Sequence, residues 1–471
     1  MTTKKVSTLR FLKWTVFSII VLRAILIAIV PLLDKTEARY GEIARLMKET
    51  SKWIVLQIDY DVVFWAKPPM STWLSALSMS AFGVNEFAAR LPAFLICLLI
   101  IYLLVRFLKS DTLSKYVPAF ILLTTPEFLL HAGVVSTDVS LLLAIVITML
   151  AYWKAVNEEK RTFWSYLFFV GIGLGLLAKG PLIIILTGPP IFIWCLLDRK
   201  RFKPTFLKLP WLLGLPITAL IAVPWYWMAE LESPGFVDYF IVGEHFKRFT
   251  ESGWSGDKYG FAKSQPLGMI WVFLFAFAFP WIQILAVMAW KKRKTIWKDP
   301  WVSFLLLWLL WTPVFFTISR NVIHTYILPS TIPMALLLVH WWKDHKNWFR
   351  LAMIFPVAIV LALGFLMVTN GWSTYMNTDK YIIQNQEVST TYKESPLIYW
   401  KQKTYSGRFY SERPTLLLNK ISSLDSLVRT EDKFFLLITE KQVKHIPERV
   451  KEKLIPLESN LKRTIYSNVK D

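Results

Sequence analysis

The sequence contains little cysteine, no nucleotide-binding fingerprint and no internal repeat. Its two cysteines, Cys97 and Cys195, each fall inside an apolar run, so we expect neither a disulfide nor a cysteine metal site. Without a glycine-rich phosphate loop, a nucleotide-dependent enzyme or an ATP-driven transporter is disfavoured. The missing repeat argues against a transporter built from duplicated halves.

What the chain does contain is apolar surface. Of its 471 residues 55% are hydrophobic, and the mean hydropathy is +0.43, which is incompatible with two or three soluble domains. The 23 Trp and 17 Tyr residues fit two aromatic belts at membrane interfaces. We therefore expect an all-α polytopic membrane protein.

The hydrophobic runs predict about eleven transmembrane helices. Most have 17 to 23 residues, enough to cross a hydrocarbon core of roughly 30 Å. The predicted spans are 12–33, 91–108, 116–133, 137–153, 163–179, 181–197, 209–228, 267–290, 301–318, 322–342 and 349–369. The first run is too long for a signal peptide and lacks a small-residue cleavage site, so we interpret it as an uncleaved span.

The placement of Lys and Arg predicts the orientation. With the N-terminus in the cytoplasm, the inside segments 1–13, 106–115, 154–161, 199–208, 291–298 and 343–350 hold 23 basic residues. The short outside connections near 132–136, 180 and 319–321 hold only Arg320. This is the positive-inside pattern, so the net charge of +21 reflects topology and does not predict nucleic-acid binding.

Two long loops, about 34–90 and 229–266, fall on the outside face. The first contains two amphipathic helical stretches, 37–50 and 73–82, of the kind that lie at an interface. Residues 371–471 are charged and alternate in the manner of strands at 397–402, 415–418, 433–439 and 463–466, with helical stretches near 422–428 and 441–454. They predict a small α/β domain outside the membrane, after a transmembrane domain of residues 1–370.

Unusual polar residues gather on this outer face, where charge near lipid is costly and indicates a site. Asp34 and Glu37 follow the first span, and either could act as a general base, although both also suit a helix N-terminus. Lys67 precedes two prolines, whose stiff backbone would hold its ammonium at a lipid phosphate; a snorkelling lysine is the alternative.

Further candidates come from the later outside segments. Asp138 and Lys179 lie at helix ends, where they could instead cap a helix or favour its dipole. Glu244, His245 and Arg248 occur within five residues and could hold a phosphate or a divalent metal, although His245 alone makes no metal site. Tyr326 could stack on a lipid or sugar, or belong to the aromatic belt.

Six segments in one order resemble a known family. They are EARYGEIAR at 37–45, KPP at 67–69, FGVNEFAARLP at 82–92, KGP at 179–181, EHFKRF at 244–249 and HTYILP at 324–329. They are similar to the lipid A aminoarabinose transferases, which are related to the protein O-mannosyltransferases and have the GT-C membrane fold. The resemblance covers about 30–340.

The resemblance implies a polyprenyl (undecaprenyl) phosphate sugar donor and an acceptor, lipid A or a related glycolipid, at the outer leaflet of the bacterial inner membrane. It implies an acidic base in the first loop, here Asp34 or Glu37, and donor-phosphate binding by Lys67, Arg248 and Tyr326. Supporting roles are expected for Tyr40, Asp138, Lys179, Glu244 and Arg320. We expect a monomer. The motifs imply no definite cofactor.

The chain departs from the family pattern at two points. The family has Asp-Glu before its small-Arg-Tyr element, whereas this chain has Thr36 and Glu37, with Asp34 two residues earlier. The family's Glu before Lys-Pro is Ala66 here, which puts a metal held with His245 in doubt.

Three function classes remain to be compared. A glycosyltransferase needs cations for the departing lipid phosphate and a carboxylate for the acceptor, in an inverting displacement. A flippase for polyprenyl-linked sugars should place ionisable groups near the bilayer midplane, where the sequence has few besides Arg23. A scaffold would not need the polar first loop, and a protein acceptor is an alternative to a glycolipid. The pattern favours the enzyme.

Overall fold

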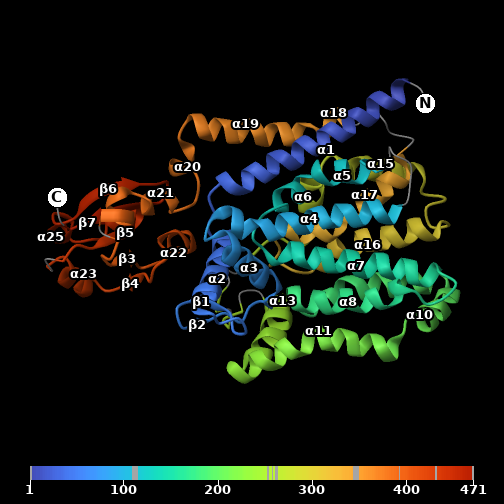
Figure 1. Cartoon of the computed structure of the whole chain (residues 1–471), viewed down its shortest axis with the longest axis horizontal. Coiled ribbons are helices and arrows are strands. Elements are labelled where there is room, and N and C mark those ends of the chain that lie inside the picture. The colour runs from blue at the N-terminus through green and yellow to red at the C-terminus, as the bar shows by residue number, and fades with distance from the viewer. Residues whose placement is uncertain are drawn as a thin grey trace.

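The computed structural model describes residues 3–108, 115–251, 254–256, 258–259, 264–342, 349–391, 393–429 and 432–468. Parts of the predicted segments 106–115, 229–266 and 343–350 lie outside these ranges. Figure 1 shows long helices running side by side, with a sheet-containing part at one end of the bundle. The mostly helical class and the C-terminal sheet are as predicted, while the domain boundary near residue 370 stays a prediction.

Among the residues that the structure describes, four helices are long and apolar enough to cross a membrane. They are α1 (Thr3–Ile29), α4 (Glu86–Leu108), α7 (Thr137–Asn157) and α11 (Trp211–Glu232). Helices α14 (Met269–Phe277) and α15 (Trp281–Lys291) pass the same test together but are bent by 103°. Shorter apolar helices are α8 (Phe163–Lys179), α9 (Leu182–Leu197), α16 (Pro300–Phe316) and α19 (Ile354–Val368). The structure supports a membrane protein but does not confirm eleven spans.

Proline explains two of the differences from the predicted spans. The segment 116–133 is divided into α5 (Val117–Leu123) and α6 (Pro126–His131), because Pro126 has no N–H to continue the helix and starts a new one. Pro280 lies at the bend between α14 and α15. Apolar length alone predicts a continuous helix at both places.

The helical elements before the sheet also include the buried helix α17 and several short ones. They are η1 (Arg199–Arg201), α10 (Phe202–Lys208), α12 (Phe236–Asp238), the π-helix η2 (Tyr239–Lys247), α13 (Arg248–Thr250), η3 (His324–Ile327), α17 (Leu328–His340), α18 (Phe349–Ala352), α20 (Gly371–Thr374), α21 (Lys380–Ile383) and η5 (Glu387–Thr391).

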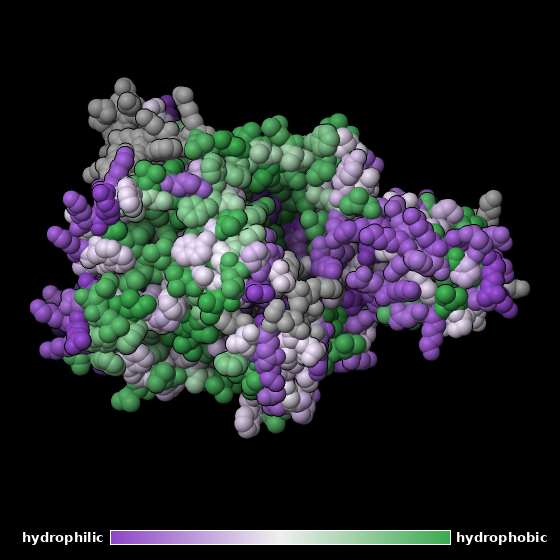
Figure 2. Space-filling view, turned by 180° about the vertical axis from the view of Figure 1, so that it is seen from behind, coloured by the Kyte–Doolittle hydropathy of each residue, from purple (hydrophilic) through white to green (hydrophobic). Residues whose placement is uncertain are grey.

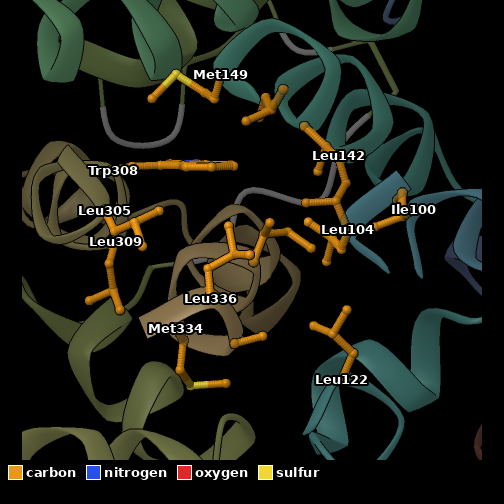
Figure 3. Close-up of a cluster of buried hydrophobic side chains, with 14 of the residues drawn as sticks. Ile100, Leu104, Leu122, Leu142, Met149, Leu305, Trp308, Leu309, Met334 and Leu336 are labelled. Atoms are coloured by element: carbon orange, nitrogen blue, oxygen red, sulfur yellow. The ribbon is translucent and has the colours of Figure 1, made fainter. Parts of the chain in front are cut away.

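The core of the bundle lies where α4, α7, α16 and α17 meet. Trp308 of α16 is 1% exposed and lies among leucines and methionines of the neighbouring helices, including Leu142, Met149 and Leu336 (Figure 3). Inside a membrane such a core is held by close van der Waals packing, because lipid tails are as apolar as the side chains. This packed interior fixes the helix ends, and therefore the loops that emerge from them.

The first long loop folds into two helices and a hairpin. Helices α2 (Thr36–Thr50) and α3 (Met70–Phe82) confirm the two helical stretches predicted there, whereas the hairpin β1 (Gln57–Asp59) and β2 (Val62–Val63) was not predicted. Most of α2 is buried, and its apolar cluster includes Phe409 of the C-terminal part. The loop is thus a folded layer between the bundle and the C-terminal part.

The C-terminal part is a five-stranded mixed sheet with short helices. Its strands, β3 (Leu397–Trp400), β4 (Leu416–Leu418), β5 (Phe435–Thr439), β6 (Ile455–Ser459) and β7 (Arg463–Ser467), are arranged in the order β4-β3-β5-β7-β6. Strands β4, β3 and β5 are parallel, and β7 is antiparallel to both β5 and β6. Helices α22 (Tyr405–Ser411), α23 (Ile421–Leu427), α24 (Glu440–Val443) and α25 (Glu448–Lys451) connect them. Strand β6 and helix α22 were not predicted.

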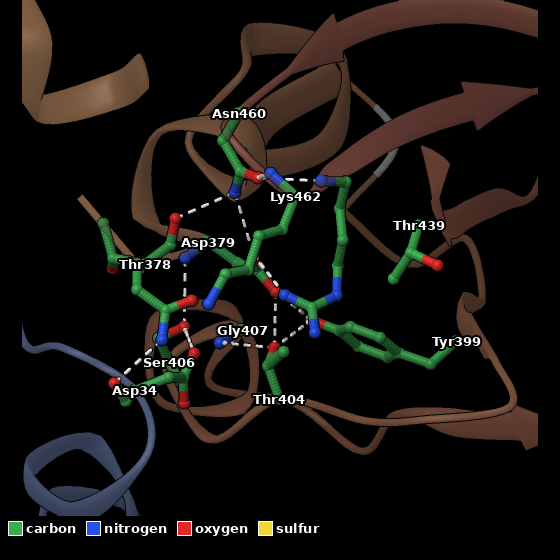
Figure 4. Close-up of polar contacts among 12 residues, drawn as sticks. Asp34, Thr378, Asp379, Tyr399, Thr404, Ser406, Gly407, Thr439, Asn460 and Lys462 are labelled. Carbon is green, nitrogen blue, oxygen red and sulfur yellow. Dashed lines mark hydrogen bonds and ion pairs between the residues drawn. The ribbon is translucent and has the colours of Figure 1, made fainter. Parts of the chain in front are cut away.

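Helix α22 attaches the C-terminal part to the first long loop. The Asp34 carboxylate accepts hydrogen bonds from the backbone N–H groups of Tyr405 and Ser406, at 3.1 Å each, and from the Ser406 hydroxyl (Figure 4). These N–H groups are unsatisfied donors at a helix start, so Asp34 caps α22 from a distant part of the chain.

Ion pairs reinforce this contact on both sides. Asp59 of β1 lies 2.9 Å from Lys403 and 3.1 Å from Arg408, and Glu86 of α4 pairs with Lys380. The Tyr410 hydroxyl donates to Glu86 at 2.9 Å. Because every pair joins the C-terminal part to residues 34–86, the two parts hold a defined relative position.

Asp34 should make stability depend on pH. Burial, reinforced by Asp379, raises the pKa of Asp34 above its ordinary value. The folded state then binds this proton more tightly than the unfolded state, so stability falls as the pH rises from about 3.9 through the raised pKa. We predict that Asp34→Asn, which keeps an oxygen acceptor, flattens this dependence of the thermal unfolding midpoint. Asp34→Ala should cost about 1 kcal/mol. An Asn variant as unstable as the Ala variant at pH 8 would contradict the capping role.

Candidate active site

Two cations from different loops meet on one carboxylate oxygen. Lys67 Nζ lies 2.9 Å from Oε2 of Glu244, and Arg248 Nη1 lies 2.8 Å from the same atom. The other oxygen, Oε1, is 3.5 Å from the Tyr239 hydroxyl. Lys67 and Arg248 are therefore close enough to bind one anionic group together.

Local structure explains why these side chains converge. Lys67 precedes Pro68 and Pro69, the residues that lead into α3, so the backbone there has little freedom. Glu244 and Arg248 lie on η2 and α13, four residues apart, which places them on one helical face.

The charge state of Glu244 follows from its neighbours. Burial acts to raise the pKa of Glu244, but the attraction of Lys67 and Arg248 outweighs it, so the pKa lies below the ordinary glutamate value. Glu244 is thus ionised at neutral pH and orients both cations.

These residues separate two adjoining chambers. A polar chamber of about 420 Å³ lies on one side, and a smaller one of about 100 Å³ lies on the other. Both are lined by Lys67, Lys179, Arg248, Asn321 and Tyr326. The smaller chamber adds the apolar side chains Leu182, Ile185, Phe315 and Phe316. Figure 2 shows the surface hollowed where the green helical part meets the purple C-terminal part.

Asp138 and Lys179 form a second charged pair on the polar chamber. Asp138 begins α7 and Lys179 ends α8, and their charged atoms are in contact. The Lys179 ammonium also lies 5.0 Å from the centre of the Tyr326 ring, a cation–π distance. Among the described residues that line this chamber, Asp138 is the only carboxylate.

A glycine allows η2 to approach Lys179. Gly180 has φ +73°, and a Cβ there would lie 2.7 Å from the Phe240 ring and 3.2 Å from His245. Only glycine combines this backbone conformation with so close a contact.

His245 does not fit the metal-binding role considered from the sequence. Nδ1 lies 2.8 Å from the Phe240 carbonyl oxygen and Nε2 lies 3.1 Å from that of Lys179, so both ring nitrogens face backbone. Burial, with Lys67 acting in the same direction, lowers the pKa of His245, while the two carbonyl oxygens oppose this shift. Within the described part of the chain no group of three His, Cys, Asp or Glu residues could hold a metal ion.

The structure places neither first-loop carboxylate on the polar chamber, contrary to the expected position of the base. Asp34 caps α22, as described above. Glu37 is buried against Arg90 of α4, with Oε1 2.7 Å from Nε and Oε2 2.8 Å from Nη2. Lys35 and Thr36, which lie between Asp34 and Glu37 in the sequence, line the chamber instead. Glu37 therefore forms an ion pair that holds α2 against the bundle.

The two remaining supporting candidates differ in position. Tyr40 lines the polar chamber, with Arg39 stacked 5.2 Å from its ring centre. Arg320 is exposed and is not among the described residues that line either chamber, although its backbone carbonyl accepts from Gln265.

One buried cluster was not foreseen from the sequence. Glu127 is fully buried, and its carboxylate lies 3.0 Å from His131 and 2.9 Å from His324. An ionisable residue inside a predicted span was the available signal, because such a residue is costly without partners. Arg23 is likewise satisfied, donating to the carbonyl oxygens of Leu130 and Ala132.

The sequence is similar to one protein family and to several known proteins. The family of dolichyl-phosphate-mannose-protein mannosyltransferases matches residues 9–240. An undecaprenyl phosphate-alpha-4-amino-4-deoxy-L-arabinose arabinosyl transferase of Erwinia tasmaniensis is 31% identical over 64% of this chain and 54% of its own. One from Pseudomonas fluorescens is 26% identical over 73% of this chain and 61% of its own. The chain thus spans less than two thirds of the length of these relatives.

Comparison with solved structures extends over the whole chain. ArnT from Cupriavidus metallidurans, in a crystal structure bound to undecaprenyl phosphate, superposes with a TM-score of 0.75 at 17% identity, covering 98% of each chain. Its apo form gives a TM-score of 0.74. At this identity the likeness shows the fold. The chain is thus similar in sequence to these transferases over about two thirds of its length, and it shares the fold of ArnT.

Proposed function

We propose that this chain is a membrane glycosyltransferase that moves a sugar from a polyprenyl (undecaprenyl) phosphate to a glycolipid acceptor, lipid A or a related molecule. The carrying observation is the convergence of Lys67 and Arg248 on one oxygen of Glu244. The names of the matched relatives support the same donor.

Lys67 and Arg248 would stabilise the leaving group. In the reaction the bond between the anomeric carbon and the phosphate oxygen breaks, and both electrons leave with the lipid phosphate. Lysine has three donors and arginine five, so each can keep Glu244 and also donate to a phosphoryl oxygen. Fixed cations in a water-poor site stabilise such charge more strongly than solvent does.

The two chambers suit the two halves of such a donor. A polyprenyl tail would leave past Leu182, Ile185 and the phenylalanines of the smaller chamber, while the sugar would occupy the polar one. The phosphate would then lie at the shared residues between them. A donor with a hydrophobic tail and a polar head needs one chamber with apolar side chains and one with polar side chains.

Asp138 is our candidate for the base, in place of Asp34 or Glu37. An acceptor oxygen that attacks the anomeric carbon opposite the phosphate would give its proton to this carboxylate, with inversion. Lys179 keeps Asp138 ionised and oriented through their contact. Tyr326 would support Lys179 from the other side.

The site would face outward. With the N-terminus in the cytoplasm, residues 34–86 and the C-terminal part would lie on the periplasmic face of the bacterial inner membrane, where an outer-leaflet acceptor is presented. The basic segments on the opposite loops support this orientation.

The phosphate-binding role predicts a change in donor affinity. Lys67→Met and Arg248→Met should each raise the KM for a synthetic labelled polyprenyl-phosphate sugar roughly 10- to 150-fold, since a hydrogen bond to a charged group contributes about 1.5–3 kcal/mol. The measurement is label transfer in detergent, which a flippase would not catalyse. Lys52→Met is the matched control, because Lys52 forms an exposed pair with Asp61 in the same loop. An unchanged donor KM in either site variant would exclude that residue.

The base assignment predicts a change in turnover instead. Asp138→Asn should lower kcat about 10²- to 10⁴-fold with little change in donor KM, because the amide still accepts from Lys179 but takes no proton. Asp61→Asn is the control; Asp61 is exposed and has φ +56°, which asparagine tolerates. A variant that keeps its kcat but loses donor affinity would show that Asp138 only positions Lys179.

A further inference from the structure

A second cavity lies between the first long loop and the C-terminal part. It measures about 800 Å³ and is larger than the polar chamber. The loop contributes residues 34–35, 58–59 and 62, and the C-terminal part contributes 377, 401–405, 408, 417, 439–441 and 461–463. We call it the interdomain cleft.

The cleft lies at a defined place in the sheet. It is lined by the residues that follow the parallel strands β3 and β5 and by those that start β7, which runs the other way beside β5. After β3 the chain goes through α22 to β4 on one side, and after β5 it goes through α24 and α25 to the opposite edge. Neighbouring parallel strands whose connections diverge leave a crevice at their carboxyl ends, and this is where open α/β sheets bind ligands.

The lining is strongly basic. Seven Lys or Arg residues and three Asp or Glu residues line it in the described part of the chain. Two of the three acidic side chains interact with other groups of the protein: Asp59 pairs with Lys403 and Arg408, and Asp34 caps α22. The excess positive charge lies on exposed lysines around the cleft: Lys35, Lys401, Lys441 and Lys462.

The cleft and the polar chamber have a lining residue in common. Lys35 lines both cavities, with Asp34 on the cleft side and Thr36 on the chamber side. Lys35 therefore places the lining of the cleft next to that of the chamber that contains Asp138 and Lys67. A volume of about 800 Å³ suits a sugar-phosphate headgroup and not a folded protein.

We propose that the interdomain cleft binds the anionic, phosphate-bearing headgroup of the acceptor, with Lys401, Lys441 and Lys462 as the C-terminal part's contacts to its phosphates. This proposal rests on the proposed function and gives the C-terminal part a role in acceptor choice. Lysine is a point charge on a flexible stem, so three of them around a crevice recognise negative charge while tolerating different sugars.

The test compares two triple variants of the full-length protein. The cleft variant is K401Q/K441Q/K462Q. The control, K420Q/K444Q/K453Q, removes the same charge from exposed lysines of the C-terminal part that do not line the cleft. The probes are a phosphorylated disaccharide glycolipid and the same glycolipid without its phosphates, used with a synthetic polyprenyl-phosphate sugar.

We expect the cleft variant to raise the KM for the phosphorylated acceptor about tenfold, equivalent to about 1.4 kcal/mol, while kcat and the donor KM stay within about twofold. The control variant should match the wild type, and the unphosphorylated acceptor should show no difference among the three proteins. Higher salt should weaken the wild type's preference for phosphate and leave the cleft variant unaffected.

Several outcomes would overturn the proposal. One is an unchanged acceptor KM in the cleft variant while transfer proceeds, which leaves the transferase function standing. Equal losses in both triple variants would indicate a general attraction of the anionic acceptor to the basic surface. Equal losses with the unphosphorylated acceptor would show that the lysines do not recognise phosphate. If the wild type transfers no sugar, the proposed function fails; calorimetric binding of the soluble phosphorylated disaccharide, weakened in the cleft variant alone, would still support the site, and absent binding would reject it.

Discussion

The site depends on one buried carboxylate that holds two cations from separate loops. By itself, the charged side chain of Glu244 would contribute little to stability, because an ion buried away from water is costly without excellent partners. Lys67 and Arg248 supply those partners, and their shared oxygen fixes the distance between the first and second long loops. The helical bundle sets where the loops emerge, and this cluster sets how they meet. Lys67 and Arg248 are therefore already positioned to bind a second anionic group.

The first long loop links the two ends of the molecule. On one side it is fastened to the bundle by Glu37 and Arg90, and on the other it receives α22 through Asp34. Asp34 and Glu37 could serve as bases if they faced the polar chamber. Instead, both hold in place the folded layer between the bundle and the C-terminal part. Among the described residues that line the polar chamber, the one carboxylate is Asp138 at the start of α7, so our proposal moves the base from the loop to the bundle.

Much of this arrangement could be predicted from the sequence, because topology alone places residues on one face. Alternating spans brought Lys67, Asp138, Lys179, Glu244 and Arg248 to the same side, and the structure brings them together. Side-chain direction could not be predicted in the same way. The partners of Asp34 and Glu37 lie 372 and 53 residues away, and only tertiary packing decides that the first faces α22 and the second faces Arg90. Prolines also divided predicted spans that hydropathy treats as continuous.

The central claim is that Lys67 and Arg248 bind one lipid phosphate. The most direct measurement is a cryo-electron microscopy structure of the full chain in lipid nanodiscs with undecaprenyl phosphate. The account predicts phosphoryl oxygens within about 2.7–3.2 Å of both cations, with the tail passing Phe315 and Phe316. A phosphate bound in contact with only one of the two cations, or away from both, would contradict it.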